Sequence, residues 1–128
     1  MESVVQANPS NWNQEVLKSI TLTVVYFWHE QCPWCSRLNP ILNEIVEEYN
    51  GKIKFVKLNV LESPGNRELA ASQGVMGTPT LMFFCQGRPL GQTVSYAPKE
   101  ELENVLNNML ERYKHCLMQS SDLRNYVV

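Results

Sequence analysis

The chain has 128 residues, a net charge of −2 at pH 7 and a charged fraction of 19%. This length predicts one domain that can bury a core without disulfides or metals to support it. The sequence has no basic run and no stretch of about 18 apolar residues, which argues against nucleic-acid binding and against a membrane-spanning helix. The start lacks the basic and apolar segments of a signal peptide, which favours a cytoplasmic protein.

Two elements are expected before the first cysteine. Ser10 or Asn11 can cap a short helix that runs to about Ser19. The residues expected on its apolar face are Trp12, Val16 and Leu17. Residues 21–28 predict a strand, and the continuous apolar run from Val24 to Trp28 indicates burial on both faces, as in the centre of a mixed or parallel sheet.

The segment after the first two cysteines predicts an amphipathic helix. Its apolar residues recur with the spacing of one helical face at Leu38, Ile41, Leu42, Ile45, Val46 and Tyr49. Pro40 lies within this helix and should kink it. Asn50-Gly51 should end it with a left-handed cap.

The second half of the chain continues the alternation of strands and helices. In chain order we expect a strand over 53–60, a turn over 63–66, a short helix over 67–73 closed by Gly74, a strand over 80–85, a turn over 86–88 and an antiparallel strand over 90–94. Pro98 suits the first turn of a long last helix. The apolar face of that helix carries Leu102, Val105, Leu106, Met109, Leu110, Tyr113 and Leu117.

This order of elements predicts an α/β fold. Strands that alternate with helices pair in parallel with helices on both faces, and the hairpin over 80–94 adds antiparallel strands. The pattern leaves open whether a strand precedes the first short helix. We expect a single domain over residues 1–118 and a C-terminal tail over 119–128.

The four cysteines divide into a close pair and two distant residues. Cys32-Pro33-Trp34-Cys35 has the CxxC spacing at which two thiols can close a disulfide on one helical turn. Cys85 and Cys116 supply no second CxxC, which argues against a structural zinc site. In a reducing compartment both would be free thiols, Cys85 as a buried small hydrophobe and Cys116 as an exposed residue, with a regulatory disulfide as the lesser alternative.

Several short motifs accompany the cysteine pair. They are Phe27-Trp28, Glu30, Pro40, Lys57-Leu58-Asn59-Val60, Pro64-Gly65, Gly74-Val75, Thr78-Pro79-Thr80-Leu81 and Gly87. With the order of the elements, they resemble the thioredoxin family over roughly residues 10–115. The resemblance implies the thioredoxin fold, in which a central mixed sheet of four or five strands is flanked by helices on both faces.

The resemblance also assigns roles to the two cysteines. It implies that Cys32 is the exposed nucleophile at the start of a helix and that Cys35, one turn deeper, is the resolving thiol. The helix dipole stabilises an anion by about 0.3–1 kcal/mol, which is less than one pKa unit. Backbone N–H groups of the first turn must therefore supply the rest of the thiolate stabilisation.

The residues around the pair are expected to shape its contacts. Pro33 and Trp34 depart from the Gly-Pro common in the family; Pro33 removes one N–H, and the Trp34 ring either docks a partner or covers the disulfide. The resemblance implies a cis bond at Thr78-Pro79, which would let the Thr78 backbone pair with an extended substrate segment.

A rim of side chains suited to a protein substrate is expected around the cysteines. Its members are Trp34, Met76, Thr78 and Tyr96. Met76 and Tyr96 are alternatively packing residues.

Tyr26 is the sharpest departure from the family, which usually carries a buried Asp there that helps to move the proton of the resolving thiol. Tyr, with an ordinary pKa of about 10, is a poor base near neutral pH. Lys57 matches the lysine that pairs with that Asp and so loses its partner. We therefore expect a slower or differently assisted step at Cys35, in which His29 or Glu30 acts through water, although His29 is more simply a solvated side chain.

The resemblance implies an enzyme that reduces protein disulfides through the reversible Cys32–Cys35 couple and a mixed-disulfide intermediate. It would need no bound cofactor, receive electrons from a thioredoxin-reductase-type donor, and act as a monomer on client proteins. The alternatives are a disulfide oxidase or isomerase, and a glutaredoxin-like enzyme that uses glutathione, for which Arg37 is the one basic residue close to Cys32. A lower alternative is a non-enzymatic binder of a metal or iron–sulfur cluster.

Overall fold

The computed structural model describes residues 4–127, with side chains described over residues 4–118. In chain order the elements are β1 (Val5–Gln6), η1 (Asn13–Leu17), β2 (Leu22–Trp28), α1 (Pro33–Glu48), β3 (Ile53–Asn59), α2 (Pro64–Ser72), β4 (Thr80–Cys85), β5 (Arg88–Val94) and α3 (Lys99–Val127). Within this described part, the strands form one five-stranded sheet in the order β1-β3-β2-β4-β5. No described helix is both long and apolar enough to cross a membrane.

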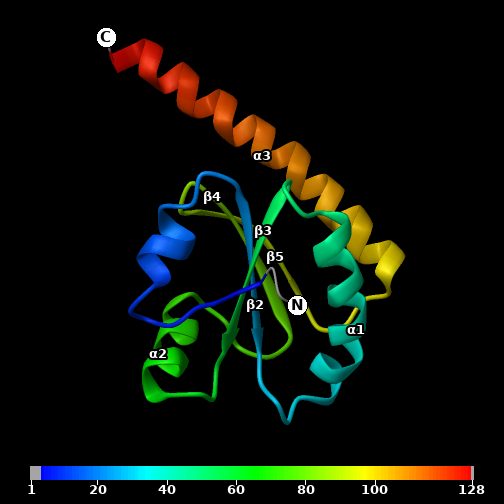
Figure 1. Ribbon diagram of the computed structural model, residues 1–128. Helices are drawn as coiled ribbons and strands as arrows, with labels where there is room; N and C mark the ends of the chain where they lie inside the picture. Colours follow the sequence, from blue (N-terminus) through cyan, green and yellow to red (C-terminus); the bar gives the residue numbers. More distant parts are fainter. Residues whose placement is uncertain (1–3, 128) are drawn as a thin grey trace.

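The sheet is mixed, as the sequence predicts. Strands β1, β3 and β2 are parallel, whereas β4 runs antiparallel to both β2 and β5. Helices α1 and α3 cover one face, and η1 and α2 cover the other (Figure 1). The expected α/β class with helices on both faces is therefore confirmed.

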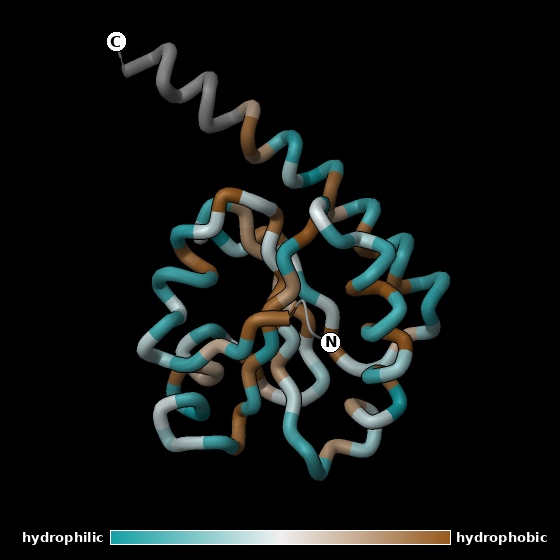
Figure 2. The backbone as a smooth tube through the Cα atoms, viewed as in Figure 1, coloured by the Kyte–Doolittle hydropathy of each residue, from teal (hydrophilic) through white to brown (hydrophobic). Residues whose placement is uncertain are grey.

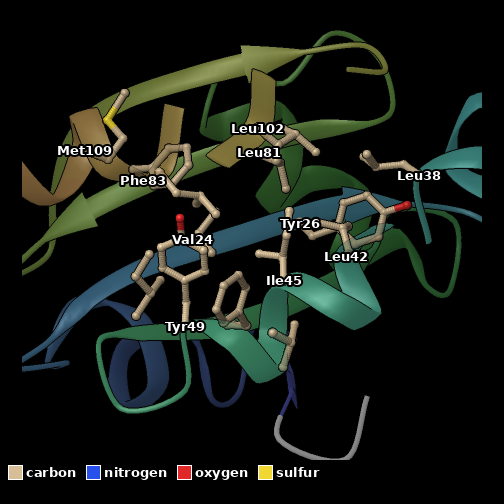
Figure 3. Close-up of a cluster of buried hydrophobic side chains, with 14 of the residues drawn as sticks. Val24, Tyr26, Leu38, Leu42, Ile45, Tyr49, Leu81, Phe83, Leu102 and Met109 are labelled. Carbon is tan, nitrogen blue, oxygen red and sulfur yellow. The ribbon is translucent and has the colours of Figure 1, made fainter. Parts of the chain in front are cut away.

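Two hydrophobic cores lie on opposite faces of β2. Val24 and Tyr26 face the core beneath α1 and α3, and Val25 and Phe27 face the core beneath η1 and α2. Figure 3 shows the first core, in which the labelled side chains are Val24, Tyr26, Leu38, Leu42, Ile45, Tyr49, Leu81, Phe83, Leu102 and Met109. This double burial explains the continuous apolar run of β2, and Figure 2 shows hydrophobic residues gathered along the central strands.

The N-terminal segment differs from the expectation in two respects. It also contains a short first strand, which the sequence pattern left open, since Val5 pairs with Val56 of β3. The turn into η1 is capped by Asn8, whose Oδ1 accepts hydrogen bonds from the backbone N–H groups of Ser10 and Asn11 at 2.9 and 3.1 Å. Neither Ser10 nor Asn11 is therefore the principal cap, because the chain begins to turn two residues earlier than predicted.

Leu17 is the second difference, because it is exposed while Trp12 and Val16 are buried as expected. Its backbone instead packs against the β4–β5 turn, where a Cβ at Gly87 would meet Leu17 O at 2.6 Å. Gly87 is thus required both by this contact and by its φ of +82°.

The helix boundaries follow local capping. Gly51, with φ +87°, takes the left-handed conformation after α1. The turn expected over 63–66 is instead the start of α2, since Ser63 Oγ accepts from Asn66 N at 3.0 Å and Pro64 occupies the first helical position. The fixed φ of proline suits the start of a helix as well as a turn.

The C-terminal segment also differs. Helix α3 continues through Val127, so the expected tail over 119–128 is helical as far as the structure describes it, and residue 128 lies outside the described residues. The segment contains no Gly or Pro that would end the helix, which accounts for its continuation.

The second pair of cysteines is bonded, which contradicts the expectation of free thiols. Cys85 at the end of β4 and Cys116 on α3 form a disulfide with Cα atoms 6.7 Å apart. Cys116 is also not exposed as predicted, since its relative exposure is only 8%. Burial follows from position, because α3 lays this residue against the end of the hairpin.

Reduction of the Cys85–Cys116 bond should lower the free energy of unfolding by about 2–4 kcal/mol, since the bond links residues separated by 31 positions and restricts the unfolded chain. Urea unfolding of the Cys32→Ser/Cys35→Ser chain, with and without reductant, measures this difference. A chain with Cys85→Ser and Cys116→Ser added is the control and should not respond to reductant. Equal midpoints for the first chain in both conditions would contradict the prediction.

Candidate active site

The Cys32–Cys35 pair lies where β2 passes into α1. Cys32 is the N-cap of α1 with an extended backbone, and Pro33 occupies the first helical position, for which its fixed φ is suited. The backbone N–H of Cys35 donates to Cys32 Sγ at 3.1 Å. The two residues form a disulfide with Cα atoms 5.2 Å apart, so both sulfurs lie on the first turn of the helix.

This geometry favours a thiolate at Cys32 after reduction. The same Cys35 N–H points at Sγ, and the helix dipole places partial positive charge at this end of α1. A hydrogen bond to the charged form lowers a thiol pKa, so the N-cap position gives Cys32 the character of a nucleophile. Pro33 offers no N–H to the sulfur, as the sequence predicts.

The expected exposure of Cys32 is wrong in the disulfide form. Its relative exposure is 4%, compared with 1% for Cys35, and both belong to the core cluster beneath α1. Trp28 and Tyr96 pack against that cluster. Cys32 is still slightly more exposed than Cys35. A partner must nevertheless approach closely, or displace part of the rim, to reach it.

Tyr26 lies buried beneath Cys35. Its hydroxyl donates to Asn39 Oδ1 at 2.8 Å and lies 3.4 Å from the carbonyl oxygen of Cys35. Burial raises the pKa of Tyr26 well above its usual value, so the hydroxyl stays protonated near neutral pH. Tyr26 is therefore a hydrogen-bond donor at this position and does not replace a carboxylate as proton acceptor.

Asn39 is a site residue that the sequence reasoning missed. It lies on α1 one turn after Cys35 and accepts a hydrogen bond from Tyr26 on β2, the strand that α1 covers. Its spacing of four residues from Cys35 was the only available signal, because the partner comes from β2, thirteen residues earlier.

Lys57 has a different neighbour from the one that the family pattern provides. It lies opposite Tyr26 in the β2–β3 register, and its Nζ lies 5.0 Å from the centroid of the Trp28 ring. This is a cation–π contact. Lys57 also lines a cavity of about 200 Å³ together with Glu30 and Glu62, so carboxylates are close to it although none of them forms a described ion pair with it.

The two other candidates for proton transfer, His29 and Glu30, border the site. Both line a second cavity, of about 370 Å³, at the end of β2. His29 Nδ1 is buried without a hydrogen-bond partner among the described residues, and its backbone oxygen accepts from Cys32 N at 3.4 Å. His29 is thus not simply a solvated side chain.

The Thr78-Pro79 segment reaches the same end of the sheet. Its peptide bond is cis, and Pro79 O accepts from Ser95 N at 2.8 Å. Thr80, the next residue, pairs with Phe27 near the end of β2, which brings the segment beside the junction that carries the cysteines. A long stretch of sequence separates the cysteine pair from Thr78-Pro79, and the pairing of β2 with β4 brings the two segments together.

The predicted rim divides into two parts. Trp34 is exposed, and its ring lies 5.8 Å from that of Tyr96, while the Arg37 guanidinium lies 4.9 Å from the Trp34 ring centroid. Met76, almost fully exposed, lines a cavity of about 250 Å³ with Thr78 and His29. Tyr96 also packs on the core, so it supports Trp34 as well as forming surface.

The described residues contain no group of three or more His, Cys, Asp or Glu side chains that could hold a metal ion. The cysteine pair by itself offers two of the four ligands that a tetrahedral zinc site needs.

Comparisons with known proteins agree on one family. The model of the family described as Thioredoxin matches residues 3–108. The chain is 36% identical over 110 residues to Thioredoxin 1 of Nostoc sp., covering 86% of this chain and all of that relative. It is 35% identical over 108 residues to the thioredoxin of Staphylococcus haemolyticus, covering 84% and 99% of the two chains. It is also 35% identical over 108 residues to the chloroplastic M-type thioredoxin of Brassica napus, covering 84% of this chain and 59% of that protein.

Tyr26→Asp should increase the rate at which Cys35 closes the disulfide by about tenfold near neutral pH. A carboxylate beneath Cys35 can accept the thiol proton, which the Tyr26 hydroxyl cannot, and a positioned base typically contributes about 10²–10⁴-fold when it acts directly. Stopped-flow fluorescence of a preformed mixed disulfide at Cys32 measures the closing rate.

Tyr26→Phe is the matched control, since it keeps the ring and removes only the hydrogen bond to Asn39. We expect its closing rate to stay close to that of the unaltered protein, because the hydroxyl that is removed does not accept the Cys35 proton. A large loss of rate in this variant would show that the hydroxyl takes part in the step.

Proposed function

The chain belongs to the thioredoxin family, and on this premise we propose that it donates electrons to the disulfides of client proteins through Cys32 and Cys35. Members of this family are disulfide oxidoreductases, and the chain is a thiol–disulfide oxidoreductase. The observation that carries the exchange chemistry is the hydrogen bond from Cys35 N to Cys32 Sγ on the first turn of α1, and the reductive direction is tested separately by the reduction potential. It favours a nucleophilic Cys32 next to a buried thiol that can resolve its adduct.

The proposed cycle needs only the two cysteines and a client disulfide. The Cys32 thiolate attacks one client sulfur, which forms a mixed disulfide and releases the other client sulfur as a thiolate. Cys35 then loses its proton and attacks Cys32 Sγ, which closes the Cys32–Cys35 bond and releases the second client thiolate. The client gains two electrons, and the cysteine pair loses two.

Proton removal from Cys35 is the step for which the chain differs from its family pattern. Tyr26 holds Asn39 and does not accept the proton. We propose that water in the cavity beside Lys57 takes it, with Glu30 and Glu62 as the carboxylates on that cavity wall. His29, whose Nδ1 lacks a described partner, is the second acceptor to test.

Client docking is proposed at the two parts of the rim. The exposed ring of Trp34, supported by Tyr96, offers an apolar surface beside the sulfurs, and Arg37 places positive charge over that ring. On the other side, Met76 and Thr78 border a cavity that can take an apolar client side chain. An extended client segment would pair with the Thr78 backbone between these parts.

The family implies disulfide substrates and a reductase as partners in general. We propose a thioredoxin-reductase-type electron donor, action as a monomer, and a reducing compartment. Relatives from bacteria favour the cytoplasm, and those named chloroplastic provide the alternative to test. Neither a membrane nor a nucleic-acid partner is part of the proposal.

The reduction potential of the Cys32–Cys35 couple tests the direction. A reductase should titrate at about −270 mV or below against a glutathione redox series. Fluorescence of Trp28 and Trp34 reports the change, and the Cys85→Ser/Cys116→Ser chain isolates the couple. A potential near that of known oxidases and isomerases, about −120 to −180 mV, would instead assign an oxidising or isomerising role.

Trapping experiments test the two cysteine roles. Cys35→Ser should accumulate a mixed disulfide at Cys32 with a disulfide-containing protein such as insulin, because the resolving thiol is missing. Cys32→Ser should form no such adduct and should lose disulfide reduction by at least about 10³-fold, as expected when the nucleophile is removed. Adducts that map to Cys35 would reverse the assignment, and equal turnover with glutathione alone as donor would favour the glutaredoxin-like alternative.

A further inference from the structure

A second disulfide lies in a cavity that the proposed function does not use. The cavity has a volume of about 380 Å³ and is formed between the β4–β5 hairpin and α3. Both Cys85 and Cys116 line it, together with Arg88, Arg112 and His115. We name it the Cys116 pocket. Its volume is within the range of small-molecule sites, and it contains a bond that can react.

The Cys116 pocket is remote from the Cys32–Cys35 pair. Thr80 begins β4 beside Pro79, and Cys85 ends the strand. A strand rises about 3.3 Å per residue, so the two ends of β4 lie roughly 17 Å apart. The second disulfide therefore cannot exchange directly with the first in the same molecule, and it needs its own reaction partner.

The lining of the pocket is cationic. Arg88 Nη2 donates to Cys116 Sγ at 3.1 Å, and Arg112 Nη1 lies 3.4 Å from Leu90 O at the pocket wall. Among the side chains that the structure describes, no Asp or Glu lines the pocket. The ion pairs found among residues 4–118 involve Lys54, Lys99 and Lys114 and do not include Arg112. The positive charge of Arg112 thus lies on the pocket wall without a described ion pair.

The two sulfurs differ in access. Cys85 has no exposed surface, whereas Cys116 retains 8% exposure and faces the arginines. After reduction, a guanidinium within hydrogen-bond distance stabilises the Cys116 thiolate. Cys116 therefore has the features of a nucleophile, and Cys85 those of a resolving thiol.

We propose that Cys85 and Cys116 form a second redox site that exchanges with small anionic thiols and disulfides of the glutathione class. The Cys116 thiolate attacks a sulfur of the small disulfide, which forms a mixed disulfide and releases one small thiolate. Cys85 then loses its proton and attacks Cys116 Sγ, which closes the Cys85–Cys116 bond and releases the second small thiolate. Two cysteine thiols are oxidised and one small disulfide is reduced to two thiols; the reverse sequence opens the bond.

The charge of the pocket gives this site its selectivity. Arg112 on the pocket wall would attract the carboxylates of an anionic disulfide and would disfavour a cationic one. The redox state of the small-thiol pool would then decide whether α3 is tied covalently to β4.

The test uses the full chain with Cys32→Ser and Cys35→Ser, reduced and freed of reductant. Its reaction with glutathione disulfide, with neutral hydroxyethyl disulfide and with dicationic cystamine is followed by intact mass and peptide mapping. We expect a transient glutathionyl adduct at Cys116 that converts to the internal disulfide. Relative to the same chain in urea, glutathione disulfide should gain about fivefold or more in rate over cystamine, as a charge–charge contribution of about one kcal/mol would produce.

Two further variants test the role of Cys85 and the role of the charge on Arg112. Adding Cys85→Ser should make the Cys116 adduct accumulate, because the resolving thiol is absent. Adding Arg112→Gln should slow the glutathione reaction about two- to fivefold and leave the rate with hydroxyethyl disulfide unchanged. Circular dichroism of each variant confirms that it is folded. Equal relative rates for the three disulfides, or an adduct that maps to Cys85, would overturn the proposal.

Discussion

Burial of β2 on both faces is the constraint on which the rest of the structure depends. Alternate side chains of this strand belong to two separate cores, so its register with β3 and β4 cannot shift by one residue without exchanging the two sets. The strand ends at Trp28, and the chain immediately turns into α1. The cysteine pair therefore lies just beyond the carboxyl end of the central strand. Packing on both faces determines the position of that strand along its whole length.

The same constraint explains how Tyr26 alters the site. Position 26 points into the core beneath α1, where a carboxylate would be desolvated and a phenol is accommodated more easily. The tyrosine satisfies its hydroxyl through Asn39. Lys57, opposite in the register, contacts the ring of Trp28. The buried polar groups beneath Cys35 are thus Tyr26 and Asn39. They form a neutral hydrogen-bonded pair, which stabilises the start of α1 but provides no base.

The two disulfides lie at opposite ends of the sheet and differ in what surrounds them. The Cys32–Cys35 bond spans one helical turn, and it is bordered by aromatic rings. The Cys85–Cys116 bond joins distant parts of the chain, and it is bordered by arginines. β4 links the two regions, since it begins beside Pro79 and ends at Cys85.

The sequence by itself determined the features that depend on local pattern. The apolar run of β2, the helical spacing from Leu38 to Tyr49 and the CxxC motif predicted the sheet, the helix and the reactive pair, because each is written in neighbouring residues. The capping at Asn8 and the helical start at Pro64 were missed, since several nearby residues could have served equally well.

Only the tertiary structure decided which distant residues meet. Asn39 on α1 accepts a hydrogen bond from Tyr26 on β2, Lys57 contacts the ring of Trp28, and Cys116 bonds to Cys85 because α3 lies along the end of the hairpin. Each of these contacts depends on how helices pack against the sheet. That packing is set by the shape of both cores together, and no short stretch of the chain encodes it.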